Sequence, residues 1–133
     1  MIICWKGSVF KETSIHSGLF CLTIEFTNTQ DQNSWLYTTV YGPNSRALKA
    51  DFKREIRASA SSIKLSWIIC GNFNMIFYIQ DRNSRILNLE NLIRDLNLFK
   101  PPIRGRKFTW TNGQEAPVWV CLDRFLVILD WLT

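Results

Sequence analysis

Two asparagines that follow a short apolar run are the first residues in this sequence whose types and spacing could support chemistry. Residues 66–70 are mostly apolar and end at Gly71, and Asn72 and Asn74 come next. Their alternate spacing predicts that both amide side chains point the same way while Phe73 points into the core. Active sites of α/β proteins gather at the carboxyl ends of such strands. Asparagines in such a place more often complete a turn, so both interpretations stay open.

A carboxylate and a guanidinium stand side by side in the otherwise apolar run of residues 121–127. They belong to Asp123 and Arg124. A charge inside an apolar strand is costly unless it is paired or used, so both side chains are candidates for a functional site. A local ion pair, or a strand that is partly exposed, explains the same pattern equally well.

A basic segment without acidic residues lies between residues 100 and 107, and aromatic residues follow it. Cations beside aromatic rings suit contact with phosphates and stacking on nucleic-acid bases. A basic surface loop next to core aromatics is at least as common. The residues concerned are Lys100, Arg104, Arg106, Lys107, Phe108 and Trp110.

Composition indicates one folded domain rather than a tail or a linker. Of the 133 residues, 47% are hydrophobic and 20% are charged, which is enough apolar surface to offset the entropy lost on folding. Sixteen Lys and Arg against eleven Asp and Glu leave a formal charge of +5. This excess permits DNA or another phosphate-bearing partner and does not require one, since such charge is as often only solvated surface.

The cysteines and the single histidine exclude a structural zinc site, because no two of them have the spacing of metal ligands. The cysteines lie in apolar, strand-like runs, so we expect free thiols in a reducing, intracellular compartment; the nucleus stays open, since no targeting signal is visible. No apolar run is long enough to cross a bilayer, and the N-terminus has no signal-peptide pattern. We therefore expect neither a membrane partner nor a small-molecule cofactor. These residues are Cys4, Cys21, Cys70, Cys121 and His16.

Hydrophobic periodicity predicts strands that alternate with two helices, which is typical of an α/β domain. One helix is expected over residues 45–59, with Leu48, Phe52 and Ile56 on its apolar stripe. Its charges, Glu55 among them, are expected to form a solvated face with weak ion pairs. A second helix is expected around residues 89–96, and residues 75–87 are left as a loop. Strands are expected over residues 2–5, 8–10, 19–26, 35–41, 66–70, 107–111 and 118–128.

Taken together, four segments resemble one family in their order and approximate spacing. They are residues 40–44, 67–74, 104–113 and 122–127, followed by Trp131. The chain resembles an endonuclease/exonuclease/phosphatase domain, and in particular the endonuclease of plant non-LTR (LINE-type) retrotransposons. The resemblance runs from Ile2 to Trp131, so residues 1–133 are expected to form a single partial domain of this kind.

This resemblance implies an α/β fold that is a fragment of a two-sheet, four-layer αββα sandwich, and Mg²⁺-dependent cleavage of a phosphodiester. It places Tyr41 near the phosphate and makes Asn44 a candidate contact to the nucleic-acid backbone. The family's Gly-Asp-x-Asn motif falls on residues 71–74, so Asn72 occupies the position of an aspartate that activates or orients water, and Asn74 helps to hold the phosphate. Asp123 matches an aspartate of the site's hydrogen-bonding network.

The departures from the family pattern decide what activity we expect. Asn72 is an amide and cannot accept a proton as a base. The family's strand with a metal-binding glutamate would precede Met1, and its Ser-Asp-His motif would follow Trp131. The sequence therefore predicts a degenerate retroelement fragment without catalytic activity, with doubtful Mg²⁺ binding and with an uncovered sheet edge that favours oligomers. The alternatives are a nucleic-acid-binding module that does not cut, and an active phosphodiesterase or phosphatase completed by other segments.

Overall fold

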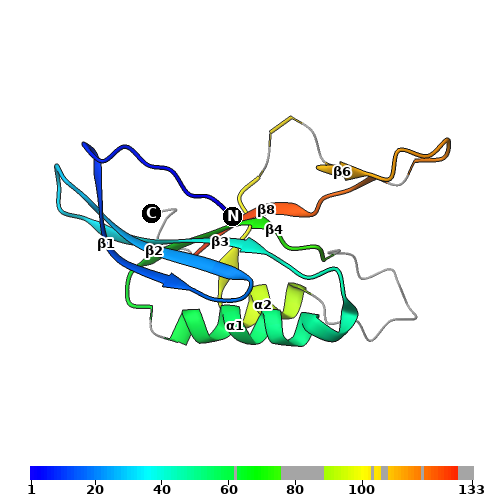
Figure 1. Cartoon of the computed structure of the whole chain (residues 1–133), viewed down its shortest axis with the longest axis horizontal. Helices are drawn as coiled ribbons and strands as arrows, with labels where there is room; N and C mark the ends of the chain where they lie inside the picture. Colours follow the sequence, from blue (N-terminus) through cyan, green and yellow to red (C-terminus); the bar gives the residue numbers. More distant parts are fainter. Residues whose placement is uncertain (62, 76–88, 103, 106–107, 118, 129–133) are drawn as a thin grey trace.

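A computed structural model describes residues 1–61, 63–75, 89–102, 104–105, 108–117 and 119–128 of the chain. Its main element is a six-stranded sheet in the order β1-β2-β3-β4-β8-β5 (Figure 1). Strands β3 and β4 run parallel, and the other neighbouring pairs run antiparallel. The strands are β1 (Phe10–Ser17), β2 (Cys21–Asn28), β3 (Ser34–Tyr41), β4 (Ser66–Asn72), β5 (Leu98–Phe99) and β8 (Asp123–Ile128).

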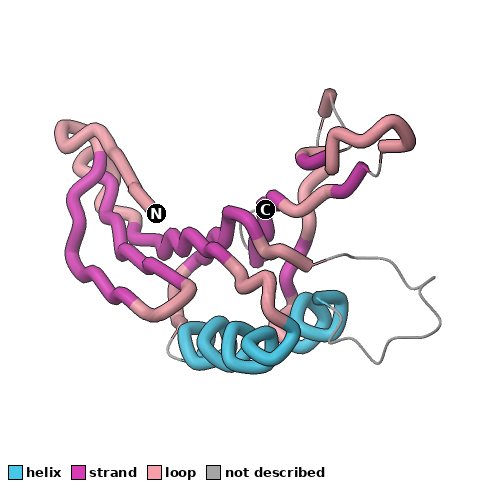
Figure 2. Tube along the Cα trace, turned by 45° about the vertical axis from the view of Figure 1, so that its right-hand side comes forward, coloured by secondary structure: helices cyan, strands magenta, loops and turns pink. Residues whose placement is uncertain are grey.

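The helices lie together on one face of this sheet (Figures 1 and 2). A short 3₁₀ turn, η1 (Arg46–Leu48), leads into α1 (Lys49–Ser61), and α2 (Leu89–Asp95) follows later in the chain. In the described part of the chain, no helix is long and apolar enough to cross a membrane. Strands β6 (Trp110–Thr111) and β7 (Trp119–Val120) form a separate two-stranded arm that projects from the sheet.

The core lies between the helices and the sheet. Phe52 and Ile56 of α1 are fully buried, and so are Ile69 of β4 and Leu126 of β8. The predicted apolar stripe is therefore confirmed for two of its three members. The third, Leu48, is 41% exposed, because the chain enters the helix through η1 and turns this side chain outward.

A chain of hydroxyl and indole groups crosses this core. The fully buried Thr38 accepts a hydrogen bond from Nε1 of Trp67 at 2.8 Å, and its Oγ1 lies 2.8 Å from Oγ1 of Thr23. Buried polar groups are tolerated when they are paired in this way. The contacts connect β2, β3 and β4 through their side chains, in addition to the backbone ladder.

Replacing Thr38 with valine is expected to destabilise the protein by about 2 kcal/mol, because the buried indole N–H of Trp67 would lose its acceptor. The isosteric Thr39→Val on the other face of β3 is the matched control and should change stability by less than about 1 kcal/mol. Urea denaturation followed by circular dichroism measures both. Equal losses for the two variants would contradict a specific role for the Thr38 hydroxyl.

The opposite face of the sheet carries an aromatic cluster, defined here as Trp5, Phe10, Phe26, Trp35 and Tyr37. The ring of Trp5 packs edge-on against Phe26 at 5.2 Å, so the N-terminal segment lies against this face. The hydroxyl of Tyr37 lies 2.7 Å from Sγ of Cys70. Burial, and then this contact, raise the pKa of the Tyr37 phenol to about 12.

Several strand boundaries differ from those expected. Residues 2–5 form no strand, and the strand expected at residues 8–10 begins at Phe10 and continues to Ser17. Its polar, exposed sequence has no alternation to reveal it, because it is the edge strand of the sheet. Residues 118–128 contain two strands, β7 and β8, rather than one. The expected loop over residues 75–87 lies almost entirely outside the described residues.

The fold class is confirmed as mixed α/β with one large sheet and two helices. A second large sheet, which a four-layer sandwich requires, is not among the described residues. The face that such a sheet would cover carries the aromatic cluster and the half-exposed side chains of Tyr41 and Phe125.

Candidate active site

The register of the sheet brings three of the candidate residues side by side. Tyr41 at the end of β3 pairs with Asn72 at the end of β4, and Asn72 pairs with Asp123 at the start of β8. Directly paired residues share a face of a sheet. Trp67 and Ile69 of β4 face the helices, so Asn72, of opposite parity, lies on the other face with Tyr41 and Asp123.

Asn72 and Asn74 also build the turn that ends β4. Oδ1 of Asn72 accepts a hydrogen bond from the backbone N–H of Asn74 at 2.8 Å. Asn74 has a φ of +47°, so the strand alternation expected from the sequence does not extend to it. Its Nδ2 donates to the carbonyl of Gly42 at 2.7 Å, which fastens the end of β4 to the end of β3. Phe73 is fully buried, as expected.

Gly42 is required by the close approach of these two strand ends. Its N–H donates to the carbonyl of Asn72 at 2.7 Å. A Cβ at this position would lie 2.2 Å from the carbonyl oxygen of Phe73, which is backbone and cannot move aside. The sequence after β3 therefore turns away through Gly42 and the buried Pro43, and Asn44 follows with an exposed side chain.

A threonine holds the chain where β8 begins. Oγ1 of Thr109 accepts hydrogen bonds from the backbone N–H groups of Leu122 and Asp123, at 3.0 and 3.1 Å. The carbonyl of Leu122 in turn accepts from the N–H of Phe73 at 2.9 Å. These contacts fix the exposed Asp123 carboxylate beside the turn made by the two asparagines. Thr109 lies 13 residues before Leu122, and nothing in its sequence context signals this role.

Arg124 has a different environment from its neighbour. It is 3% exposed on the helix side of β8, and its Nη2 donates to the carbonyl of Cys121 at 2.6 Å. The adjacent charges of the sequence thus lie on opposite faces of the strand. Asp123 belongs to the candidate site, and Arg124 belongs to the packing of the sheet.

The described site does not fit a magnesium ion. Mg²⁺ in nuclease-type sites is held by one or two carboxylates together with substrate phosphates. Of Tyr41, Asn72, Asn74 and Asp123, only Asp123 has a carboxylate, and Oδ1 of Asn72 is already engaged by Asn74. Among the described residues, no group of three His, Cys, Asp or Glu side chains could hold a metal.

The nucleic-acid candidates lie on and near the β6–β7 arm. Arg104 is exposed, and Trp110 of β6 is 47% exposed. Phe108 and Trp119 pack against each other with ring centroids 6.5 Å apart, and both keep about half of their surface exposed. Arg106, Lys107 and Trp131 lie outside the described residues.

Comparison with known proteins shows what this architecture is similar to. No family model matches the sequence, and no curated protein matches it. Among solved structures, the endonuclease domain of TRAS1, a telomere-specific non-LTR retrotransposon, superimposes with a TM-score of 0.64 at 13% identity, over 85% of this chain and 52% of that one. An endonuclease/exonuclease/phosphatase family protein from Bacteroides thetaiotaomicron gives 0.65 at 10% identity, over 92% and 52%. The chain has the endonuclease/exonuclease/phosphatase fold.

A third structure extends the similarity to a phosphatase of the same fold. ANGEL2, a 2′,3′-cyclic phosphatase in complex with adenosine-2′,3′-vanadate, gives a TM-score of 0.60 at 11% identity, over 94% of this chain and 57% of that one. The chain therefore spans about half the length of the endonuclease/exonuclease/phosphatase structures that it matches. The likeness to endonuclease/exonuclease/phosphatase structures expected from the resemblance is confirmed, including that to a retrotransposon endonuclease, and so is the mixed α/β class of the fold.

Proposed function

We propose that this chain is a degenerate piece of a phosphodiester-cleaving endonuclease domain from a retroelement, and that it does not cleave. One observation carries the proposal: an asparagine, Asn72, stands between Tyr41 and Asp123 at the end of β4, where the family motif has an aspartate. Its side-chain oxygen is engaged in a turn by the N–H of Asn74. An amide in this place supports the structure of the site without supplying a base.

The expected loss of reaction rate can be estimated from the contribution of a general base. A general base contributes about 10²–10⁴-fold to rate by taking a proton in the transition state. A carboxamide cannot do this near neutral pH. The remaining carboxylate, Asp123, is exposed to solvent and is held through its backbone N–H by Thr109 rather than by a charged neighbour. It gives a divalent cation one ligand, which supports our expectation that Mg²⁺ binds weakly.

We also propose that the sheet is one half of a two-sheet sandwich, as in the resemblance. The face away from the helices carries the aromatic cluster, while Tyr41 and Phe125 there are 57% and 56% exposed. Apolar side chains on a sheet face are stabilised when a second layer covers them. In this arrangement Tyr41, Asn72 and Asp123 lie at the mouth between the two sheets.

The arm supports a second function, nucleic-acid binding without cleavage. Phe108, Trp110 and Trp119 expose 45–53% of their surface on or beside a two-stranded arm that projects from the sheet. Lys100 and Arg104 are exposed on the segment that leads into it. Aromatic rings offer stacking surfaces to bases, and cations contact phosphates. We propose DNA as the partner of this surface.

A salt titration tests this binding function. Replacing Arg104, Arg106 and Lys107 together with alanine is expected to weaken DNA binding and to reduce the slope of log K against log salt by about 2–3, because each phosphate contact adds about 0.9 to that slope. Fluorescence anisotropy with a labelled duplex measures both quantities.

A matched triple variant controls for overall charge. Lys6, Lys11 and Arg46 are exposed and lie outside residues 100–120, and their replacement with alanine removes the same formal charge. The control variant should keep the slope of the unmodified chain. A slope that is unchanged in the first variant, or equally reduced in both, would show that the basic segment is only solvated surface.

A further inference from the structure

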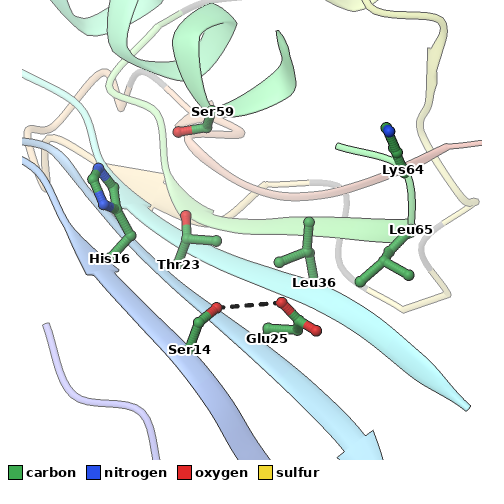
Figure 3. A pocket seen from close by; sticks show the side chains of 8 residues that line it. All are labelled: Ser14, His16, Thr23, Glu25, Leu36, Ser59, Lys64 and Leu65. Atoms are coloured by element: carbon green, nitrogen blue, oxygen red, sulfur yellow. Dashed lines mark hydrogen bonds between the residues drawn. The ribbon is translucent and has the colours of Figure 1, made fainter. Parts of the chain in front are cut away.

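A pocket of about 410 Å³ with several polar side chains in its lining lies on the helix side of the sheet, on the opposite face from Tyr41, Asn72 and Asp123 (Figure 3). Strands β1, β2 and β3 form its floor, the end of α1 stands above it, and Lys64 and Leu65 close one side. The volume falls in the usual range of small-molecule sites. Its polar lining consists of Ser14, His16, Thr23, Glu25, Ser59 and Lys64.

A break in the register of β1 turns two of these side chains into the pocket. Before the break Glu12 pairs with Phe26, and after it Ser14 pairs with Glu25 and His16 with Thr23. The irregularity between Glu12 and Ser14 places Ser14 and His16 on the helix side of the sheet, whereas Glu12 lies on the other side. Bulges commonly re-aim side chains beside a site in this way. Here they bring a hydroxyl and an imidazole next to the Glu25 carboxylate and the Thr23 hydroxyl.

The pocket holds one negative and one positive side chain that are not paired with each other. Oε2 of Glu25 accepts a hydrogen bond from Ser14 at 3.3 Å. Lys64 lies at another side of the pocket, with Leu36 and Leu65 also in the lining. Neither Glu25 nor Lys64 forms an ion pair with another residue in the described part of the chain.

We propose that this pocket binds a small zwitterion, with its ammonium group on Glu25 and its carboxylate or other oxyanion on Lys64. The hydrocarbon part of the ligand lies over Leu36 and Leu65, beside Thr23 and Ser59. A ligand with both charges satisfies both side chains at once, and an ion of either sign satisfies only one. The site is independent of the proposed nuclease ancestry, because it lies on the other face of the sheet.

The affinities of a series of linear ω-amino acids test the proposed site directly. Glycine, 4-aminobutyrate and 6-aminohexanoate carry the two charges at increasing separation, and butyrate and butylamine carry one charge each. His16 is the single histidine of the chain, so its imidazole NMR signals report on the pocket without ambiguity. In the intact chain, one length of amino acid should shift these signals with an affinity at least about tenfold above either one-charge compound.

Three variants test which charged group of the ligand binds to Glu25 and which binds to Lys64. Glu25→Gln should bring the amino acid down to the affinity of butyrate, and Lys64→Gln should bring it down to that of butylamine. Glu12→Gln, on the same edge strand but across the register break, should change nothing. Lys64 is exposed, so its replacement leaves folding intact even where Glu25→Gln does not. Equal affinity for all five compounds, no saturable shift, or insensitivity to Lys64→Gln would overturn the proposal.

Discussion

Replacing Glu55 with alanine is expected to lower the free energy of unfolding by about 3 kcal/mol, although the residue lies on a helix face rich in charge. Its carboxylate accepts hydrogen bonds from three consecutive backbone N–H groups where β1 turns into β2. The distances are 3.2 Å from Leu19, 3.0 Å from Phe20 and 2.8 Å from Cys21. Two of these residues are buried, so removing the acceptor leaves amides that water cannot easily reach. Urea denaturation followed by circular dichroism measures the loss.

Two further variants separate this role from general surface charge. Glu55→Gln keeps one acceptor oxygen and loses the charge, so about half of the destabilisation should remain. Asp51→Ala removes an exposed carboxylate of the same helix that pairs with Arg54 at 2.8 Å, and such surface pairs contribute less than about 1 kcal/mol. If Asp51→Ala cost as much as Glu55→Ala, the contact to the β1–β2 turn would not be what stabilises the fold.

The same carboxylate shapes the chemistry of a neighbouring thiol. Burial, followed by the nearby Glu55 charge, raises the pKa of Cys21 well above its usual value. Cys21 is therefore a buried, unreactive thiol, as its apolar context in the sequence predicts. The sequence could not predict the contact itself, because Glu55 and Cys21 are 34 residues apart and meet only when α1 packs beside the hairpin. The charge pattern of a helix in the sequence is the same whether a carboxylate is solvated or accepts hydrogen bonds from the backbone of another segment.

Elements with strong periodicity were predictable, and elements defined by their neighbours were not. The alternation of β2, the aromatic and β-branched residues of β3, and the spacing of Phe52 and Ile56 each specify a local structure. Strand β1 is polar along most of its length and exists because β2 offers it a partner. Strand β5 has two residues and pairs with the end of β8, and no local pattern in the sequence predicts this contact.

The candidate site shows the same division. The motif at residues 71–74 is visible in the sequence, and its two interpretations are compatible: the asparagines complete a turn at the position where the resemblance places a catalytic motif. Asn72 stands between Tyr41 and Asp123 because β3 pairs in parallel with β4, and β4 pairs antiparallel with β8. Register of this kind is a property of the assembled sheet.

Restoring the aspartate with Asn72→Asp is expected to yield no Mg²⁺-dependent nicking of supercoiled plasmid, and the unmodified chain is expected to yield none either. The new carboxylate would be nearly isosteric with the amide and would keep the hydrogen bond from Asn74, so the turn should survive. It would face Asp123 directly across the β4–β8 ladder, and like charges in that arrangement repel. Two carboxylates at this end of the sheet, that of residue 72 being engaged by the N–H of Asn74, still lack a further acidic ligand among the described residues.

The assay needs controls that separate this chain from contaminating nuclease, because a trace of the latter nicks plasmid readily. Asn72→Asp, Asp123→Asn, the double variant Asn72→Asp/Asp123→Asn and the unmodified chain are purified in parallel and assayed with Mg²⁺ and with EDTA. Nicking that appears in Asn72→Asp, vanishes with EDTA and is lost in the double variant would show that Tyr41, Asn74 and Asp123 suffice and that one substitution silenced an enzyme. Nicking by the unmodified chain that is lost in Asp123→Asn would contradict the proposed function itself. A site with an amide in place of its base would then cleave DNA. Groups other than Asn72 would in that case have compensated for the loss of about 10²–10⁴-fold in rate that follows from removing a general base.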